Sequence, residues 1–119
     1  MIGYVTLGTN DLPRAVAFYD ALFATMAESD CVMVDGTFWT DDEMIAAGLS
    51  TKTARDIGHL PQSGAGGMLD WLGELPGHIR KILIHINNTN PILDEDSPER
   101  AELTRRGIEV AEDGWRIDL

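Results

Sequence analysis

Lys81-Ile82-Leu83-Ile84-His85-Ile86-Asn87-Asn88-Thr89-Asn90-Pro91 is the most informative stretch of this chain. Its first half is an apolar run rich in β-branched residues, which is typical of a buried strand. The run delivers His85 near its end and then breaks into a polar loop that stops at Pro91. A histidine at the C-terminal edge of a core strand is a candidate metal ligand or catalytic base. The alternative is a histidine that only bonds a backbone carbonyl beneath a loop.

A second apolar run has the same organisation. Residues 31–39 (CVMVDGTFW) form a predicted strand that ends in Asp35, followed by a glycine turn. Between the two runs, the segment 58–61 (GHLP) opens a glycine-rich stretch that leads into a helix. Sites in open α/β sheets form at the carboxyl ends of strands. We therefore expect Asp35 and His59 within hydrogen-bonding or water-bridged distance, with His85 nearby.

The rest of the chain alternates between helix and strand signals, which predicts an α/β fold. Short helices are expected over 41–47 and 66–75, and a third is capped by Ser97 and stopped by Gly107. Residues 108–111 and 115–119 alternate in polarity around a Glu-Asp-Gly turn, which predicts a β-hairpin.

Composition narrows the possible functions. At 119 residues and 44% hydrophobic content, one small domain is expected. A net charge of −11 argues against nucleic-acid binding, because a polyanion is bound by basic surface. The acidic runs at 41–43 and 94–96 are interpreted as helix caps and solvated faces. The single Cys31 fits a reducing, cytoplasmic location, and we expect neither a signal peptide nor a membrane span.

From residue 29 to 119 the sequence resembles the C-terminal part of the coenzyme PQQ synthesis protein B family, within the metallo-β-lactamase superfamily. The motifs that carry this resemblance are VDGTFWTDDEM (34–44), GHLPQSGAGG (58–67), ILIHINNTNPILDEDSPERAEL (82–103) and GIEVAEDGW (107–115). The resemblance implies the C-terminal half of an αββα sandwich, to which an N-terminal βα unit is added.

Residues 1–28 resemble the opening βα unit of glyoxalase, or vicinal oxygen chelate, proteins. A strand is expected over 2–8, and Asn10 or Asp11 can cap a helix that carries the Phe18-Tyr19 pair of that family. Members of this family often place a metal-binding histidine on the first strand, and this strand has none. We therefore expect the chain to join two unrelated segments, 1–28 and 29–119.

The resemblance to the PQQ family also implies an activity. That family is regarded as a metal-dependent hydroxylase of a PQQ precursor peptide, and an older description has it transporting PQQ or its precursor. By resemblance, His85 is a metal ligand, and Asp35 and His59 form a catalytic pair that uses Fe or Zn. The family's His-x-His-x-Asp-His motif is absent here. We therefore expect substoichiometric metal or none, and catalysis by this chain alone stays open.

Two other functions remain as alternatives. The chain could be a non-catalytic binding or dimerising module with a glyoxalase-like N-terminal segment. A true glyoxalase-like enzyme is disfavoured, because its motifs stop after the first helix. In either case half of a sandwich leaves one sheet face uncovered, so we expect marginal stability and homo-oligomers through that face.

Overall fold

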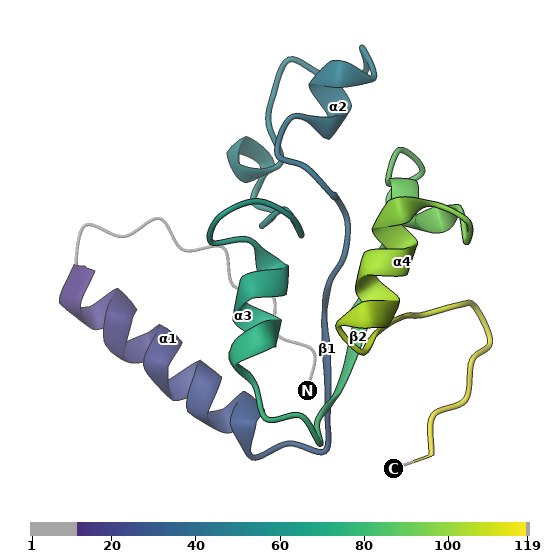
Figure 1. Ribbon diagram of the computed structural model, residues 1–119. Helices are drawn as coiled ribbons and strands as arrows, with labels where there is room; N and C mark the ends of the chain where they lie inside the picture. The colour runs from purple at the N-terminus through teal and green to yellow at the C-terminus, as the bar shows by residue number, and fades with distance from the viewer. Residues whose placement is uncertain (1–11, 119) are drawn as a thin grey trace.

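Three parallel strands form the centre of the computed structural model, which describes residues 12–118 (Figure 1). They are β1 (Cys31–Asp35), β2 (Arg80–Ile84) and β3 (Ile108–Val110), hydrogen-bonded in that order. Both pairs are parallel, and Asp35 lies opposite Ile84 at the carboxyl end of the sheet. The predicted α/β class is confirmed.

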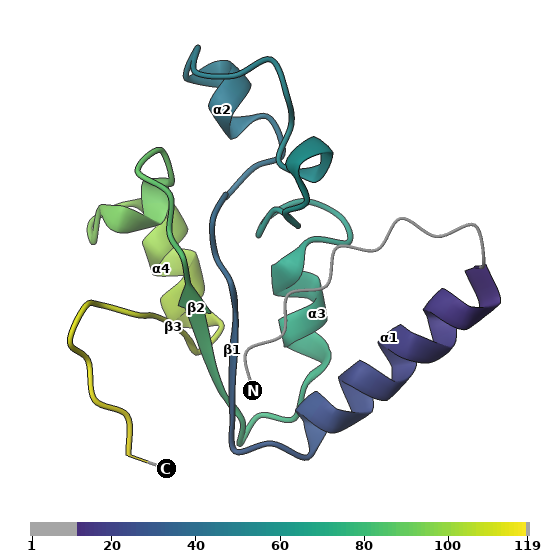
Figure 2. The same cartoon turned by 180° about the vertical axis from the view of Figure 1, so that it is seen from behind.

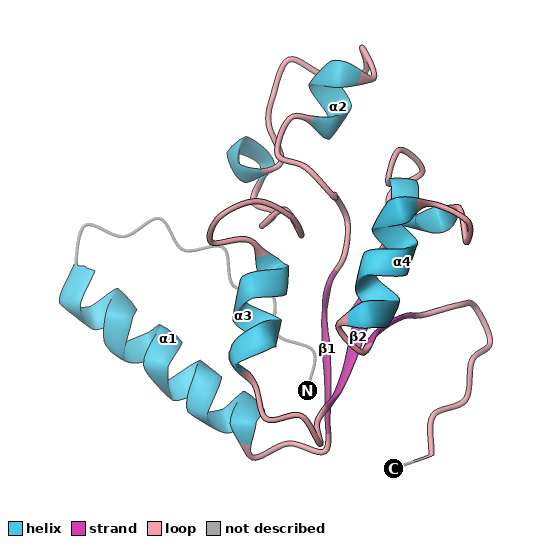
Figure 3. Ribbon diagram, viewed as in Figure 1, coloured by secondary structure: helices cyan, strands magenta, loops and turns pink. Residues whose placement is uncertain are grey.

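Helices connect the strands and cover one face of the sheet. α3 follows β1 and lies beside it, and α4 follows β2 and lies beside β2 and β3 (Figures 1 and 2). Buried side chains of both helices belong to one core cluster with the strands, so both helices cover the same face. Right-handed crossovers between neighbouring parallel strands place the helices in this way. Figure 3 shows that long loops make up much of the remainder. The helical elements are α1 (Leu12–Ala27), α2 (Glu43–Ala46), η1 (Arg55–Ile57), α3 (Met68–Glu74), η2 (Pro91–Leu93) and α4 (Pro98–Arg105).

The core lies between this sheet face and the two covering helices. Alternation along the strands points Val32, Leu83 and Val110 to the same face. Burying each such aliphatic side chain contributes about 1.5–3 kcal/mol. The buried cluster consists of Val32, Leu69, Leu72, Leu75, Ile79, Leu83, Ile92, Leu103, Ile108 and Val110.

The start and the end of α4 follow the predicted signals. The hydroxyl of Ser97 accepts a hydrogen bond from the backbone N–H of Arg100 at 3.0 Å, and Pro98 occupies the first helical position. Gly107 has a φ of 66°, a left-handed conformation that ends the helix and starts β3.

The predicted hairpin after β3 is wrong. Residues 115–118 form no strand, and β3 pairs in parallel with β2 instead. Arg80 accounts for the difference: its guanidinium makes two 3.0 Å bonds to Glu109 and lies 5.8 Å from the ring centre of Trp115. These contacts hold the C-terminal segment as a loop, and the bonds from Arg80 lower the pKa of Glu109 below its ordinary value.

α1 forms as predicted, and among its described side chains those at the C-terminal end contact the core. Phe23 and Met26 pack against the buried cluster, and the Phe23 ring lies 6.3 Å from that of Trp71. Further toward the N-terminus Val16 and Leu22 are exposed. The helix runs obliquely away from the sheet (Figures 1 and 2). The predicted strand over 2–8 and the cap at Asn10 or Asp11 lie outside the described residues.

β1 and β2 approach each other closely just beyond Asp35. The N–H of Gly36 donates to the carbonyl of Ile84 at 2.7 Å, which continues the ladder past the end of β1. A Cβ added to Gly36 would lie 2.7 Å from Cδ1 of Ile86 and 2.8 Å from Cβ of Leu83. Only glycine therefore allows this contact.

We expect the amides of residues 16–22 in α1 to exchange with solvent at least about tenfold faster than those of β2. The exposed turns of α1 have little tertiary packing to oppose local opening, whereas β2 is paired on both sides. Hydrogen exchange followed by NMR measures both rates in one sample. Equal protection of the two segments would show that α1 is an integral part of the cooperative unit.

We expect Gly36→Ala to lower the free energy of unfolding by about 1–3 kcal/mol, because the methyl group overpacks the junction of β1 and β2. Gly73→Ala is the matched control, since nothing lies within 4 Å of a Cβ at that position in α3. Alanine is the better helix former there, so this control should be neutral or stabilising. Urea unfolding of both variants provides the comparison, and a neutral Gly36→Ala would contradict the steric argument.

Candidate functional site

Asp35 and His59 form a hydrogen-bonded pair at the carboxyl end of the sheet. Nδ1 of His59 lies 2.8 Å from Oδ2 of Asp35, and both side chains are about one-fifth exposed, at 21% and 19%. The other oxygen of the carboxylate, Oδ1, accepts a 2.6 Å bond from the hydroxyl of Thr37. The predicted contact between Asp35 and His59 is thus present, 24 residues apart in sequence.

The surroundings of His59 define the orientation of its ring. Phe38 is buried and packs edge-on against the imidazole, with 5.4 Å between ring centres. The backbone N–H of His59 donates to the carbonyl of Ala54 at 2.9 Å. An ionised carboxylate can only accept hydrogen bonds, so Nδ1 carries the proton shared with Asp35. Nε2 of the neutral ring is then the nitrogen with a lone pair for a metal or a proton.

His85 lies at the same edge of the sheet, one residue beyond the register partner of Asp35. β2 ends at Ile84, earlier than the predicted strand, because His85 has a φ of 59° and leaves the extended conformation. Among the described non-glycine residues, His85 is the one in the left-handed region. Hydrogen bonds between the two loops bracket it: Gly36 donates to Ile84, and Asn87 donates to Thr37 at 3.1 Å. His85 is therefore an exposed residue on a bulge that follows β2, at the same edge of the sheet as Asp35.

Sequence reasoning missed Glu43. It was interpreted as part of a solvated acidic face, yet it is only 8% exposed. One of its carboxylate oxygens accepts the N–H of Trp39 at 2.6 Å, and the other accepts the hydroxyl of Thr89. Glu43 thereby ties the loop after β1 to the loop after β2. The Thr-x-x-Glu pattern starting at Thr40 resembles a capping box, and it was the available signal.

Two buried amides were also missed, Gln62 and Asn90. Nε2 of Gln62 donates to the carbonyl of Gly36, and Nδ2 of Asn90 donates to the carbonyls of Gly36 at 3.0 Å and Thr37 at 3.2 Å. Both side chains are almost completely buried. No periodic pattern marks such residues in a sequence.

The described residues do not include a complete metal-binding set. No group of three or more His, Cys, Asp or Glu side chains suited to one metal ion occurs within residues 12–118. A catalytic metal usually takes about three protein ligands. His78 is exposed and precedes β2, so it lies at the opposite end of that strand from His85.

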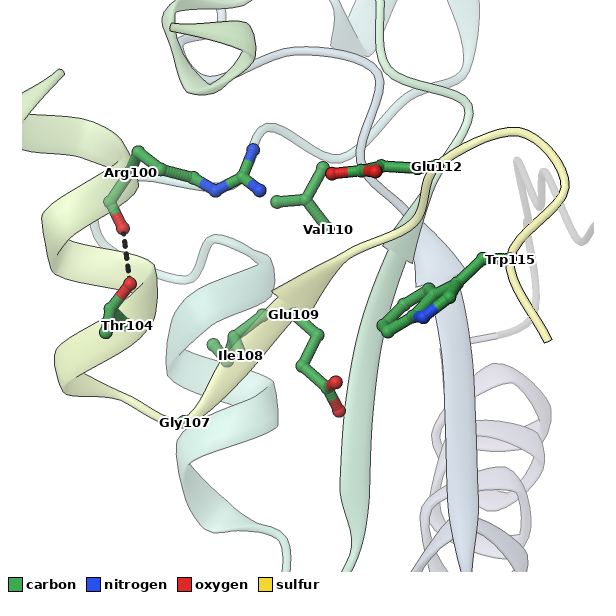
Figure 4. A pocket seen from close by; sticks show the side chains of 8 residues that line it. All are labelled: Arg100, Thr104, Gly107, Ile108, Glu109, Val110, Glu112 and Trp115. Atoms are coloured by element: carbon green, nitrogen blue, oxygen red, sulfur yellow. Dashed lines mark hydrogen bonds between the residues drawn. The ribbon is translucent and has the colours of Figure 1, made fainter. Parts of the chain in front are cut away.

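A shallow groove elsewhere on the molecule contains none of these residues. It lies between α4 and the outer edge of β3 (Figure 4). Arg100 and Glu112 lie on opposite sides of it, and Trp115 closes one end. In the part of the chain that the structure describes, no helix is long and apolar enough to cross a membrane.

Curated proteins that are similar to this chain share a single name. Coenzyme PQQ synthesis protein B of Azoarcus sp. is 66% identical over 98 residues, which are 82% of this chain and 32% of that protein. The protein of the same name from Azotobacter vinelandii is 68% identical over 94 residues, covering 79% of this chain and 30% of its own length. The chain thus spans about a third of the length of the curated relatives it matches.

A solved structure of a protein from the same family is also similar to this chain. Zn(2+)-bound PqqB from Methylobacterium extorquens superimposes with a TM-score of 0.78 at 44% identity, over 84% of this chain and 36% of that chain.

A family model described as Beta-lactamase superfamily domain matches residues 10–86. This match includes α1, so it gives no support to the glyoxalase-like interpretation of residues 1–28. It covers more than half of the chain and contains Asp35, His59 and His85. The chain therefore belongs to the beta-lactamase superfamily, and within it resembles about a third of PQQ synthesis protein B.

Proposed function

We propose that this chain supplies one side of a PQQ synthesis protein B-like metal site and has its role in PQQ biosynthesis. The observation that carries the proposal is the hydrogen-bonded Asp35–His59 pair at the carboxyl edge of the sheet, the edge at which β2 also ends and leads into His85. The zinc in the related M. extorquens structure and the identity of 62–68% to curated relatives support it. The role that we propose there, as the resemblance implies, is hydroxylation of the PQQ precursor peptide or transport of PQQ or its precursor.

The donor types at this edge suit Zn or Fe. Neutral imidazole nitrogen is a good ligand for both metals, and His59 and His85 are the two imidazoles at this edge of the sheet. When bound, such a metal acts as a Lewis acid that activates water or oxygen. Asp35 holds His59 in one orientation and one tautomer, as carboxylates do beside metal-binding histidines. The described residues alone do not complete the ligand set.

The number of metal ligands limits the reaction that this chain can carry out alone. With fewer than three protein ligands, a metal stays exchangeable, so hydroxylation needs ligands supplied in addition to His59 and His85. We propose that this chain alone therefore binds metal weakly and that the full activity depends on those further ligands. The single free Cys31 supports a cytoplasmic location.

After dialysis we expect less than one equivalent of Fe or Zn per chain. His85→Ala should remove most of what remains, because it deletes one of the two imidazoles at the proposed site. His78→Ala is the matched control, since His78 is also exposed but lies at the other end of β2. Elemental analysis of the three proteins tests this. One tightly held metal per chain that is lost in His85→Ala would contradict the incomplete site.

A second candidate function is a dimerising module, and the exposure of Met33 favours it. Met33 lies on the sheet face opposite α3 and α4 and is 50% exposed, although its neighbour Ile82 is buried. We propose that two copies associate through this face. Each copy carries a net charge of −11, so mutual repulsion opposes association at low salt.

We expect sedimentation velocity to show concentration-dependent association that strengthens with added salt. Met33→Glu should shift the population toward monomer, because it places charge on the proposed contact. Leu49→Glu is the control, since Leu49 is 64% exposed in the loop after α2, away from the sheet face. Monomers at every concentration, or an equal effect of both variants, would rule this function out.

A further inference from the structure

The dipeptide Gly36–Thr37 connects every part of the candidate site. Asp35 precedes it, and the hydroxyl of Thr37 bonds the carboxylate of Asp35. The N–H of Gly36 and the carbonyl of Thr37 bond Ile84 and Asn87, the residues on either side of the His85 bulge. A shift of this dipeptide would therefore move the Asp35–His59 pair and His85 together.

We propose that Gln62 and Asn90 are positioning residues that fix Gly36–Thr37, and through it Asp35, His59 and His85. They approach the dipeptide from two separate loops, one in the glycine-rich segment before α3 and one after β2. The carbonyl of Gly36 accepts from both amides, and the carbonyl of Thr37 accepts from Asn90. This inference rests on the proposed function, because it assigns a role within the same site.

Both side chains are buried, so water cannot replace a hydrogen bond that either amide loses. Gln62 has no exposed surface and Asn90 only 2%. Asn90 is further locked because its Oδ1 accepts the N–H of Ile92 at 3.1 Å, which leaves Nδ2 directed at the dipeptide. The Oε1 atom of Gln62 is buried without a hydrogen bond to any described residue. Turning the amide over would set two carbonyl oxygens against each other, so the donor has to face Gly36.

The donor requirement gives near-isosteric test variants, Gln62→Glu and Asn90→Asp. Each replaces the donating NH2 group by a carboxylate oxygen, which in its ionised form only accepts hydrogen bonds, at almost unchanged shape. Ser63→Ala is the matched control: its hydroxyl donates to the carbonyl of Trp39 at 2.7 Å from the same loop, but it does not touch the dipeptide. Asp35→Asn provides the reference for a His59 ring released from its carboxylate.

The readout is the tautomer of His59, measured by long-range 1H–15N NMR near pH 8, where imidazole is neutral. Wild type and Ser63→Ala should show a single tautomer with the proton on Nδ1. Gln62→Glu and Asn90→Asp should shift the ring nitrogens toward averaged values, as in Asp35→Asn. A merely structural role would lower stability without changing the tautomer, and an unchanged tautomer in both variants would overturn the proposal.

Wild-type protein gives a test that needs no variant to fold. The amides of Gly36 and Asn87, which bond across the site, should exchange as slowly as those of β2. Fast exchange of both would show that the dipeptide is not held in place and would overturn the proposal.

Zn2+ titration separates this inference from the proposed function. If the chain binds Zn2+, Gln62→Glu should weaken the affinity by roughly tenfold or more, as loss of a supporting hydrogen bond does. An affinity equal to that of wild type would count against the positioning role. If wild type binds no Zn2+ at all, the proposed metal function fails, while the tautomer result still decides the role of Gln62 and Asn90.

Discussion

The close passage of Gly36 along β2 is the constraint on which the rest of the structure depends. Without a side chain at this position, the backbone after β1 stays bonded to β2 and brings two loops to one edge of the sheet. Glu43 joins the same two loops through Trp39 and Thr89. The polar groups of these loops are mostly satisfied by one another, which is how irregular backbone is tolerated inside a small domain.

The sequence predicted those parts of the fold that leave a periodic or local signal. The apolar runs ending at Asp35 and His85 and the cap of α4 at Ser97 are such signals, and the Asp35–His59 contact followed from them because parallel strands end at one edge. The hairpin failed because turn composition says nothing of the competing contact between Arg80 and Trp115. Gln62 and Asn90 were not predicted, because the partners of a buried amide are distant in sequence and are seen only in the folded structure.

Membership of the superfamily is compatible with the lack of a three-ligand group within residues 12–118. The relatives are about three times as long as the region they share with this chain, and the M. extorquens structure contains zinc. Here residues 12–118 contain the hydrogen-bonded Asp35–His59 pair and the bulged His85 at one edge of the sheet.

The parallel pairing of β1 with β2 has a consequence for how the chain folds. Cys31 pairs with Arg80, so the central ladder closes only after the intervening loops and α3 have been made. Contacts between residues so distant in sequence slow folding, because the chain entropy is lost before the contacts stabilise it. On the ribosome, the apolar residues of α1 and β1 emerge well before their partner strand. This protein should therefore depend on chaperones more than its small size suggests.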